Sequence, residues 1–322
     1  MMIWLDSRRS KKKSPNENFP RELLELFTMG VDTYSQEDVV AASQAFTGYN
    51  TDGYITNYHF EARRADGEYW QKHHDFNHKE FLRKGGSFDG DDIIEIILEQ
   101  DVVANFICEK IYKWFVYEIP DENFVNQMAT ILRNGNYEIK PVMEYLLTSE
   151  HFYDINFRGS QIPNPVSQIL GLIRKLNLHN MEYPNKYLQR SIGDMGMTLL
   201  YPPNVNGWTG HRAWINSITL PMRKRLSSIL IDPDTDQRLK FHINIIELAN
   251  NLSDPNDPRS LVKDFALVLF GLPLSENLEN KLVEILMDGA AEYDWDINDS
   301  GANYRLKELV KYMLRLPEAQ LA

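Results

Sequence analysis

Two histidines occupy positions where a predicted β-hairpin would bring their side chains together. Aromatic and polar residues alternate ahead of Asp66-Gly67, a pair that is typical of the two-residue turn between antiparallel strands. Pairing outward from that turn places His59 opposite His74 on one face of the hairpin. Two imidazoles on facing strand positions can bind one divalent metal ion, with a third ligand from Glu61, from His78 or from another element.

The same histidines also have a structural interpretation. At the end of a hairpin they can form a polar, partly solvated surface and hydrogen-bond to the backbone, to Tyr58 or to Asp75. In the catalytic interpretation, His74 and Asp75 are candidate acid–base residues of a metal-assisted hydrolase or oxidoreductase. The residue pattern leaves both interpretations open.

Two carboxylates on a predicted helix are candidates for supporting such a site. Apolar residues at helical spacing predict an amphipathic helix between Asn18 and Gly30. Glu22 or Glu25, on this helix, could complete a site with His74. Equally, these glutamates could form a solvated, salt-bridged face of the helix.

A second group of candidate residues lies in and after a proline-rich loop. Two prolines stiffen the segment before Trp208, and two tryptophans offer flat apolar faces. Such faces suit carbohydrate or peptide binding, and they suit anchoring a loop into the core equally well. The candidate ligand-binding residues of this region are Asn204, Trp208, Trp214 and Arg223.

Composition excludes several classes of site. The chain has 322 residues, a formal net charge of −12 and one cysteine. Disulfides, Cys-ligated zinc and iron–sulfur clusters each need two or more cysteines, so they are excluded. The acidic balance argues against nucleic acid as a partner. No apolar run approaches the roughly 18 residues of a membrane span.

The candidate residues are carried by a chain whose dominant pattern is helical. Capping residues and apolar periodicity predict a mainly α, multi-helix, bundle-like fold with one β-hairpin at about 54–75, inserted between the second and third helices. The acidic stretch 232–236 is typical of a linker. We therefore expect a helical domain over 1–231 and a C-terminal helical subdomain over 237–322.

Short motifs follow one another in a characteristic order. They include Ala45-Phe46-Thr47-Gly48, His74-Asp75, Phe88-Asp89-Gly90-Asp91-Asp92, Pro202-Pro203-Asn204-Val205-Asn206-Gly207-Trp208 and Trp214-Ile215-Asn216-Ser217. With these motifs, the chain resembles the bacterial family called domain of unknown function 1800. The resemblance covers roughly residues 1–230 and corresponds to the C-terminal two thirds of a typical member.

The resemblance implies little about activity, because this family has no settled one. Members are typically longer at the N-terminus, and the five apolar residues 1–5 accordingly suggest a fragment or a late start codon. Many members are periplasmic or exported and are encoded beside an exported phosphatase- or sulfatase-like protein. This chain carries no signal-peptide pattern, so an envelope location follows from analogy alone.

Two functional hypotheses remain. The first is a non-catalytic envelope or accessory protein that binds a partner protein or a glycan. It is favoured because the sequence lacks the motifs of serine hydrolases, P-loop enzymes, dinucleotide-binding enzymes and zinc proteases. The second is the metal-assisted enzyme, with a divalent metal at His59 and His74.

Overall fold

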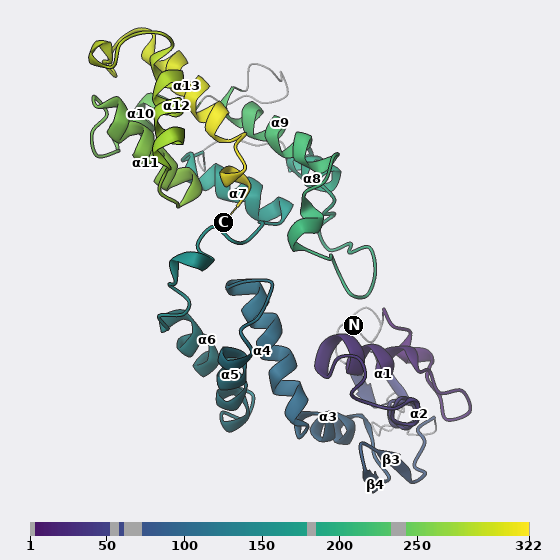
Figure 1. Ribbon diagram of the computed structural model, residues 1–322. Coiled ribbons are helices and arrows are strands. Elements are labelled where there is room, and N and C mark those ends of the chain that lie inside the picture. Colours follow the sequence, from purple (N-terminus) through teal and green to yellow (C-terminus); the bar gives the residue numbers. More distant parts are fainter. Residues whose placement is uncertain (1–3, 52–57, 61–72, 179–184, 233–242, 322) are drawn as a thin grey trace. The chain divides into compact units, whose positions relative to one another are not determined.

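The computed structural model describes residues 4–51, 58–60, 73–178, 185–232 and 243–321. The chain divides into two compact units, one formed by residues 1–115 with 119–149 and the other by 116–118 with 150–322. Figure 1 shows the helices of the first unit in purple to blue and those of the second in teal to yellow. Each unit is described by itself.

Side-chain caps fix where the helices of the first unit begin. Ser35 and Asp38 form a capping box at the start of α2, and Asp89 and Asp92 form another at the start of α3. The helical segment after Glu17 changes its hydrogen-bond spacing at Leu23 and continues as a single π-helical stretch. The elements are α1 (Asn18–Glu22), the π-helix (Leu23–Thr28), α2 (Gln36–Ala45), α3 (Gly90–Leu98), α4 (Asp101–Phe115), α5 (Glu122–Asn134) and α6 (Ile139–Thr148).

Short antiparallel strands lie between α2 and α3. Strand β1 (Tyr49–Thr51) pairs with β2 (Tyr58–Phe60), and β3 (Lys79–Phe81) pairs with β4 (Lys84–Gly86). The structure thus confirms the predicted class, mainly α with a β-hairpin between the second and third predicted helices. The pair β3–β4 is an additional short hairpin in the same interval.

The register of the predicted hairpin is corrected. His59 lies opposite Asn50 of β1, whereas His74 is in a segment without regular secondary structure. Strand β1 is held in place by Tyr49, whose hydroxyl accepts a hydrogen bond from the backbone N–H of Gly90 at 3.0 Å. The segment just after α2 therefore provides the partner strand for β2. The predicted turn Asp66-Gly67 lies outside the described residues.

The second unit has one continuous apolar core. Buried residues from α7 through α13 belong to a single cluster that extends along the chain from Ile169 to Leu314. The helices are α7 (Pro165–Lys175), α8 (Asn185–Asp194), α9 (Thr219–Ile231), α10 (Ile245–Asn250), α11 (Pro258–Phe270), α12 (Glu276–Met287) and α13 (Ala302–Met313).

The helices before and after the predicted linker at 232–236 bury their apolar faces in the same cluster. Residues 233–236 lie outside the described residues, and the predicted subdomain over 237–322 stays a prediction. The two compact units of the structure divide near residues 149 and 150. The C-terminal turn also returns to this core, since Gln168 of α7 donates a side-chain hydrogen bond to Gln320 at 3.0 Å (Figure 1). Within the described residues, no helix has the length and apolar character that crossing a bilayer requires.

Replacing Leu306 in the centre of this core by alanine should destabilise the second unit. Leu306 is fully buried in α13, so Leu306→Ala removes apolar contacts and leaves a cavity. We expect the free energy of unfolding, measured by urea denaturation, to fall by about 2–5 kcal/mol. The matched variant Tyr304→Ala, exposed on the same helix, should change it by less than about 0.5 kcal/mol. Equal effects of the two substitutions would contradict a core at this position.

Candidate functional site

His74 is buried and held by the loop that follows α2. Its side chain is 2% exposed, and its Nδ1 lies 2.9 Å from the carbonyl oxygen of Thr47. Because a carbonyl only accepts, Nδ1 carries the proton in this contact. Burial lowers the pKa of His74, against the opposing effect of the Thr47 carbonyl. The imidazole is therefore held neutral, in one defined tautomer.

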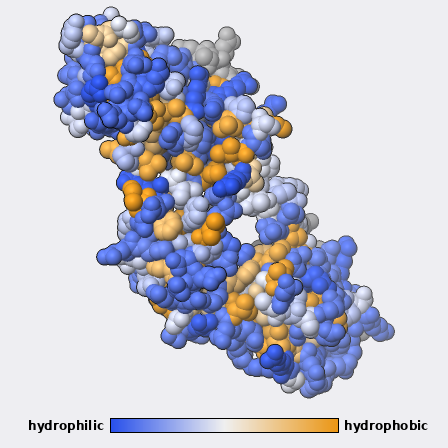
Figure 2. All heavy atoms as spheres, in the orientation of Figure 1, coloured by the Kyte–Doolittle hydropathy of each residue, from blue (hydrophilic) through white to orange (hydrophobic). Residues whose placement is uncertain are grey.

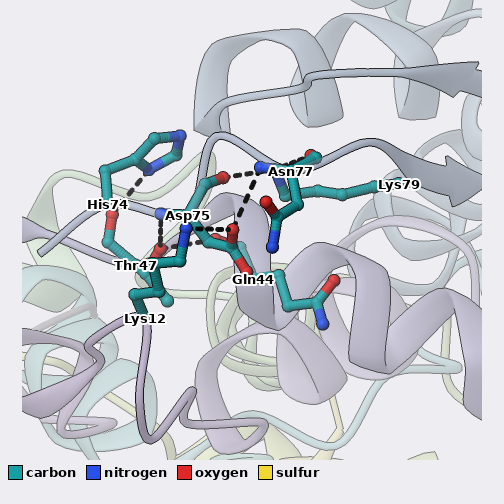
Figure 3. Close-up of polar contacts among 7 residues, drawn as sticks. All are labelled: Lys12, Gln44, Thr47, His74, Asp75, Asn77 and Lys79. Atoms are coloured by element: carbon teal, nitrogen blue, oxygen red, sulfur yellow. Dashed lines mark hydrogen bonds and ion pairs between the residues drawn. The ribbon is translucent and has the colours of Figure 1, made fainter.

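Asp75, the next residue, is held by one hydrogen bond from its backbone N–H and one to its carboxylate. Its N–H donates to the Thr47 hydroxyl at 2.8 Å, and its carboxylate accepts from the N–H of Asn77 at 3.0 Å (Figure 3). The Thr47 hydroxyl donates in turn to the carbonyl of Gln44 at the end of α2. Segment 74–77 is thus tied to α2 through one threonine side chain.

Two lysines supply the positive charge around Asp75. Lys12 places its ammonium 3.3 Å from the Asp75 carboxylate. Lys79 is buried, and its ammonium donates to the backbone carbonyls of Asp75 and Asn77, the latter at 3.0 Å (Figure 3). Burial alone would raise the pKa of Asp75, but the Asn77 N–H and the two lysines outweigh that effect and lower it.

These contacts are those of a structural clasp. The clasp is defined as Thr47, His74, Asp75, Asn77 and Lys79, and each of these hydrogen bonds has a backbone group as donor or acceptor. It ties residues 74–77, which have no regular secondary structure, to the loop that follows α2. Such an arrangement fixes the conformation of this segment.

The other residues proposed for this site are placed as follows. Glu25 accepts a hydrogen bond from the Tyr34 hydroxyl at 3.3 Å. The pKa of Glu22 is raised by burial and by the negative charge of Glu25. The side chain of His59 lies outside the described part of the structure. Among the described residues, no cluster of three or more histidine, cysteine or acidic side chains is arranged to hold a metal ion. The metal site at His59 and His74 stays a prediction.

The loop between α8 and α9 contains the second group of candidate residues. Its C-terminal end is anchored where Thr219 donates from its hydroxyl to the Trp214 carbonyl at 2.9 Å. The Asn216 side chain caps the same turn by accepting from the backbone N–H of Thr219 at 2.9 Å. Trp214 and Arg223 are buried, Trp208 is half-buried and Asn204 is exposed. Trp214 is thus buried at the end of the loop, whereas Arg223 lies on α9 and donates to the carbonyl of Pro163, before α7.

The exposed apolar part of this loop lies just before the prolines. We call Leu199, Leu200 and Tyr201 the apolar tip; their exposed fractions are 49%, 94% and 81%. Leu200 has a positive φ of 61°, a conformation that costs energy for a side chain other than glycine. The analysis of the sequence did not identify these residues, although three apolar residues directly before Pro202-Pro203 were a visible signal.

Comparison with models of known protein families matches nearly the whole chain to one family. A family model described as "Protein of unknown function (DUF1800)" matches residues 1–321. The chain belongs to the DUF1800 family. The match confirms the resemblance read from the motifs and extends it over both units of this DUF1800 protein. No curated protein and no solved structure gave a match.

The stability of the first unit of this DUF1800 protein should depend on pH through His74. The folded-state pKa of His74 lies below the ordinary value of 6.5, so the unfolded chain binds the proton more readily. Its contribution to stability is therefore complete above about pH 6.5 and is lost as the pH falls through the folded-state pKa. We expect the free energy of unfolding to fall with a slope of up to about 1.4 kcal/mol per pH unit.

The variant His74→Gln should flatten this dependence between pH 7 and 5, as measured by urea denaturation at a series of pH values. His78→Gln, a substitution of an exposed histidine four residues away, is the matched control and should keep the wild-type slope. An unchanged slope in His74→Gln would contradict the assignment.

Proposed function

We propose that this protein is a non-catalytic binding protein that contacts a partner protein through the apolar tip, Leu199, Leu200 and Tyr201. The observation that carries the proposal is the near-complete exposure of Leu200 and Tyr201 on an anchored loop. Isolated exposed apolar residues are common on proteins, but three consecutive ones at one loop are a typical feature of binding surfaces. Figure 2 shows that apolar side chains gather in several patches on the visible face of the molecule. Exposure alone therefore does not single out the apolar tip, and the conformation of its loop is a second argument.

Restricted conformation supports binding through this loop. The apolar tip is followed by Pro202-Pro203, each of which fixes its own φ angle. Gly207 and Gly210 adopt positive φ angles of 87° and 77°, and Asn216 with Thr219 anchors the end of the loop. A loop that is already ordered loses little conformational entropy on binding, so more of the contact energy appears as affinity.

A protein is a better-matched partner than a glycan. Leu199 and Leu200 are branched aliphatic side chains, which fill pockets between other side chains. Stacking on sugar rings uses flat aromatic faces, of which the apolar tip offers one, Tyr201, beside its two leucines. The two candidate tryptophans of this region are half-buried or buried. We therefore place a partner protein ahead of the glycan.

The identity proposed for the partner comes from the family resemblance. Members are often encoded beside an exported phosphatase- or sulfatase-like protein, and we propose that the product of such a neighbouring gene is the partner, met in the periplasm or outside the cell. The structural clasp supports a binding function over catalysis, since His74, Asp75 and Lys79 hydrogen-bond to the backbone of their own chain.

Binding to the purified phosphatase- or sulfatase-like neighbour, measured by biolayer interferometry, tests this proposal. The double variant Leu200→Ser with Tyr201→Ser removes the apolar contact area and should raise Kd at least about tenfold, or 1.4 kcal/mol. Circular dichroism should be unchanged, because both side chains are exposed.

The matched control replaces two exposed apolar residues elsewhere in the second unit, Leu267→Ser with Tyr293→Ser. This control should bind like the wild type. Wild-type affinity in the Leu200/Tyr201 variant would rule out the apolar tip as the contact surface. Absence of binding by the wild-type chain would rule out the proposed partner.

A further inference from the structure

Arg223 is the largest fully buried side chain of the described residues, with 1% of its surface exposed. It lies on α9, in the second unit, and its Nη2 donates to the backbone carbonyl of Pro163 at 2.8 Å. Within the described part of the chain, its Nε and Nη1 atoms are buried and have no hydrogen-bond partner. A guanidinium with most of its donors unused inside a protein is unusual, since buried polar groups are nearly always paired.

The charge of Arg223 is also uncompensated. Its one acceptor is a neutral carbonyl, and none of the ion pairs between described residues includes it. Burial lowers the pKa of Arg223 to about 10, so the side chain is still a cation at pH 7. A buried charge without a counter-charge is strongly destabilising, which indicates that an anion neutralises it in the functional protein.

The N-terminus of α7 adds positive potential at the same place. Pro163, the acceptor for Arg223, stands two residues before the first residue of α7, an 11-residue helix. In the first turn, the Asn164 side chain accepts from the N–H of Ser167, and Pro165 has no N–H. The N–H groups of Ser167 and Gln168 are both paired with Asn164, so it is the helix dipole that favours a negative charge at this terminus. The helix end and the unpaired guanidinium are independent features that favour the same ligand.

We propose that Arg223 and the N-terminal turn of α7 form a binding site for a small carboxylate anion. A carboxylate carries one negative charge, which balances one guanidinium, and its planar oxygens match the planar N–H donors. The coil at 161–164, which leads into α7 and supplies the Pro163 carbonyl, is half-buried. This inference concerns the base of the second unit and does not depend on the apolar tip as a docking surface.

Thermal unfolding of the full chain in sodium acetate tests the proposal. Acetate is the probe, at pH 7.5, with ionic strength held constant by sodium chloride, whose anion is not a carboxylate. A ligand that binds only the folded state stabilises it in a saturable way. We expect the Tm of the second unit in differential scanning calorimetry to rise by about 2–4 °C at saturation in the wild type.

Arg223→Met should abolish this rise, whereas Arg225→Met, which removes an exposed arginine of the same helix, should retain it. If Arg223→Met does not fold, Arg223→Lys should fold with a single ammonium and require roughly tenfold more acetate for half-saturation. An equal response to acetate in the wild type and in either Arg223 variant would overturn the proposal. An equal rise with sodium chloride would overturn the assignment to a carboxylate, as would a wild type without a saturable rise.

Discussion

The cost of burying a positive charge is the constraint on which both units depend. In the first unit, Lys79 is buried with its ammonium on the carbonyls of Asp75 and Asn77, close to the negative charge of Asp75. The charge and its donors are thereby matched inside the chain. In the second unit, Arg223 is buried with one carbonyl as its acceptor. The chain provides two carbonyl acceptors for Lys79 and one for Arg223. We therefore interpret the clasp around Lys79 as structural and the surroundings of Arg223 as a candidate binding site.

Lys79 also explains why a segment that resembles an active site is better interpreted as structural. A histidine next to an aspartate, with lysines nearby, has the composition of an acid–base site. Here the Thr47 carbonyl orients the imidazole, and the Thr47 hydroxyl receives the N–H of Asp75. Hydrogen bonds to Thr47 therefore hold residues 74–77, which have no regular secondary structure.

The sequence predicted the helices well because local signals determine them. Ser35 with Asp38 and the acidic residues after Phe88 are capping boxes in the structure, as their spacing indicated. Strand pairing was harder to predict, because a turn signal such as Asp66-Gly67 does not exclude another partner strand. The pairing of His59 with Asn50 depends on Tyr49 being fixed by Gly90, 41 residues away along the chain. The division of the chain near residues 149 and 150 also depends on long-range packing.

The sequence identified candidate residues by their type, but it did not indicate which of their side chains are buried and which are exposed. Trp214 and Arg223 are prominent in the sequence, but both are buried in the structure, and burial depends on tertiary packing. The apolar tip was overlooked because leucines in a mainly helical sequence are normally core residues. Exposure is a property of the fold, so a loop that presents Leu200 to solvent is recognisable only once its neighbours are placed.

The stability of Lys79→Met tests most directly whether segment 74–79 is a structural cluster. The account predicts a fall of about 1.5–3 kcal/mol in the free energy of unfolding, because the carbonyls of Asp75 and Asn77 lose a charged donor. Lys13→Met, at an exposed position of the same unit, should have little effect. Wild-type stability in Lys79→Met would contradict the account, since the ammonium would then be available for chemistry and not required by the fold.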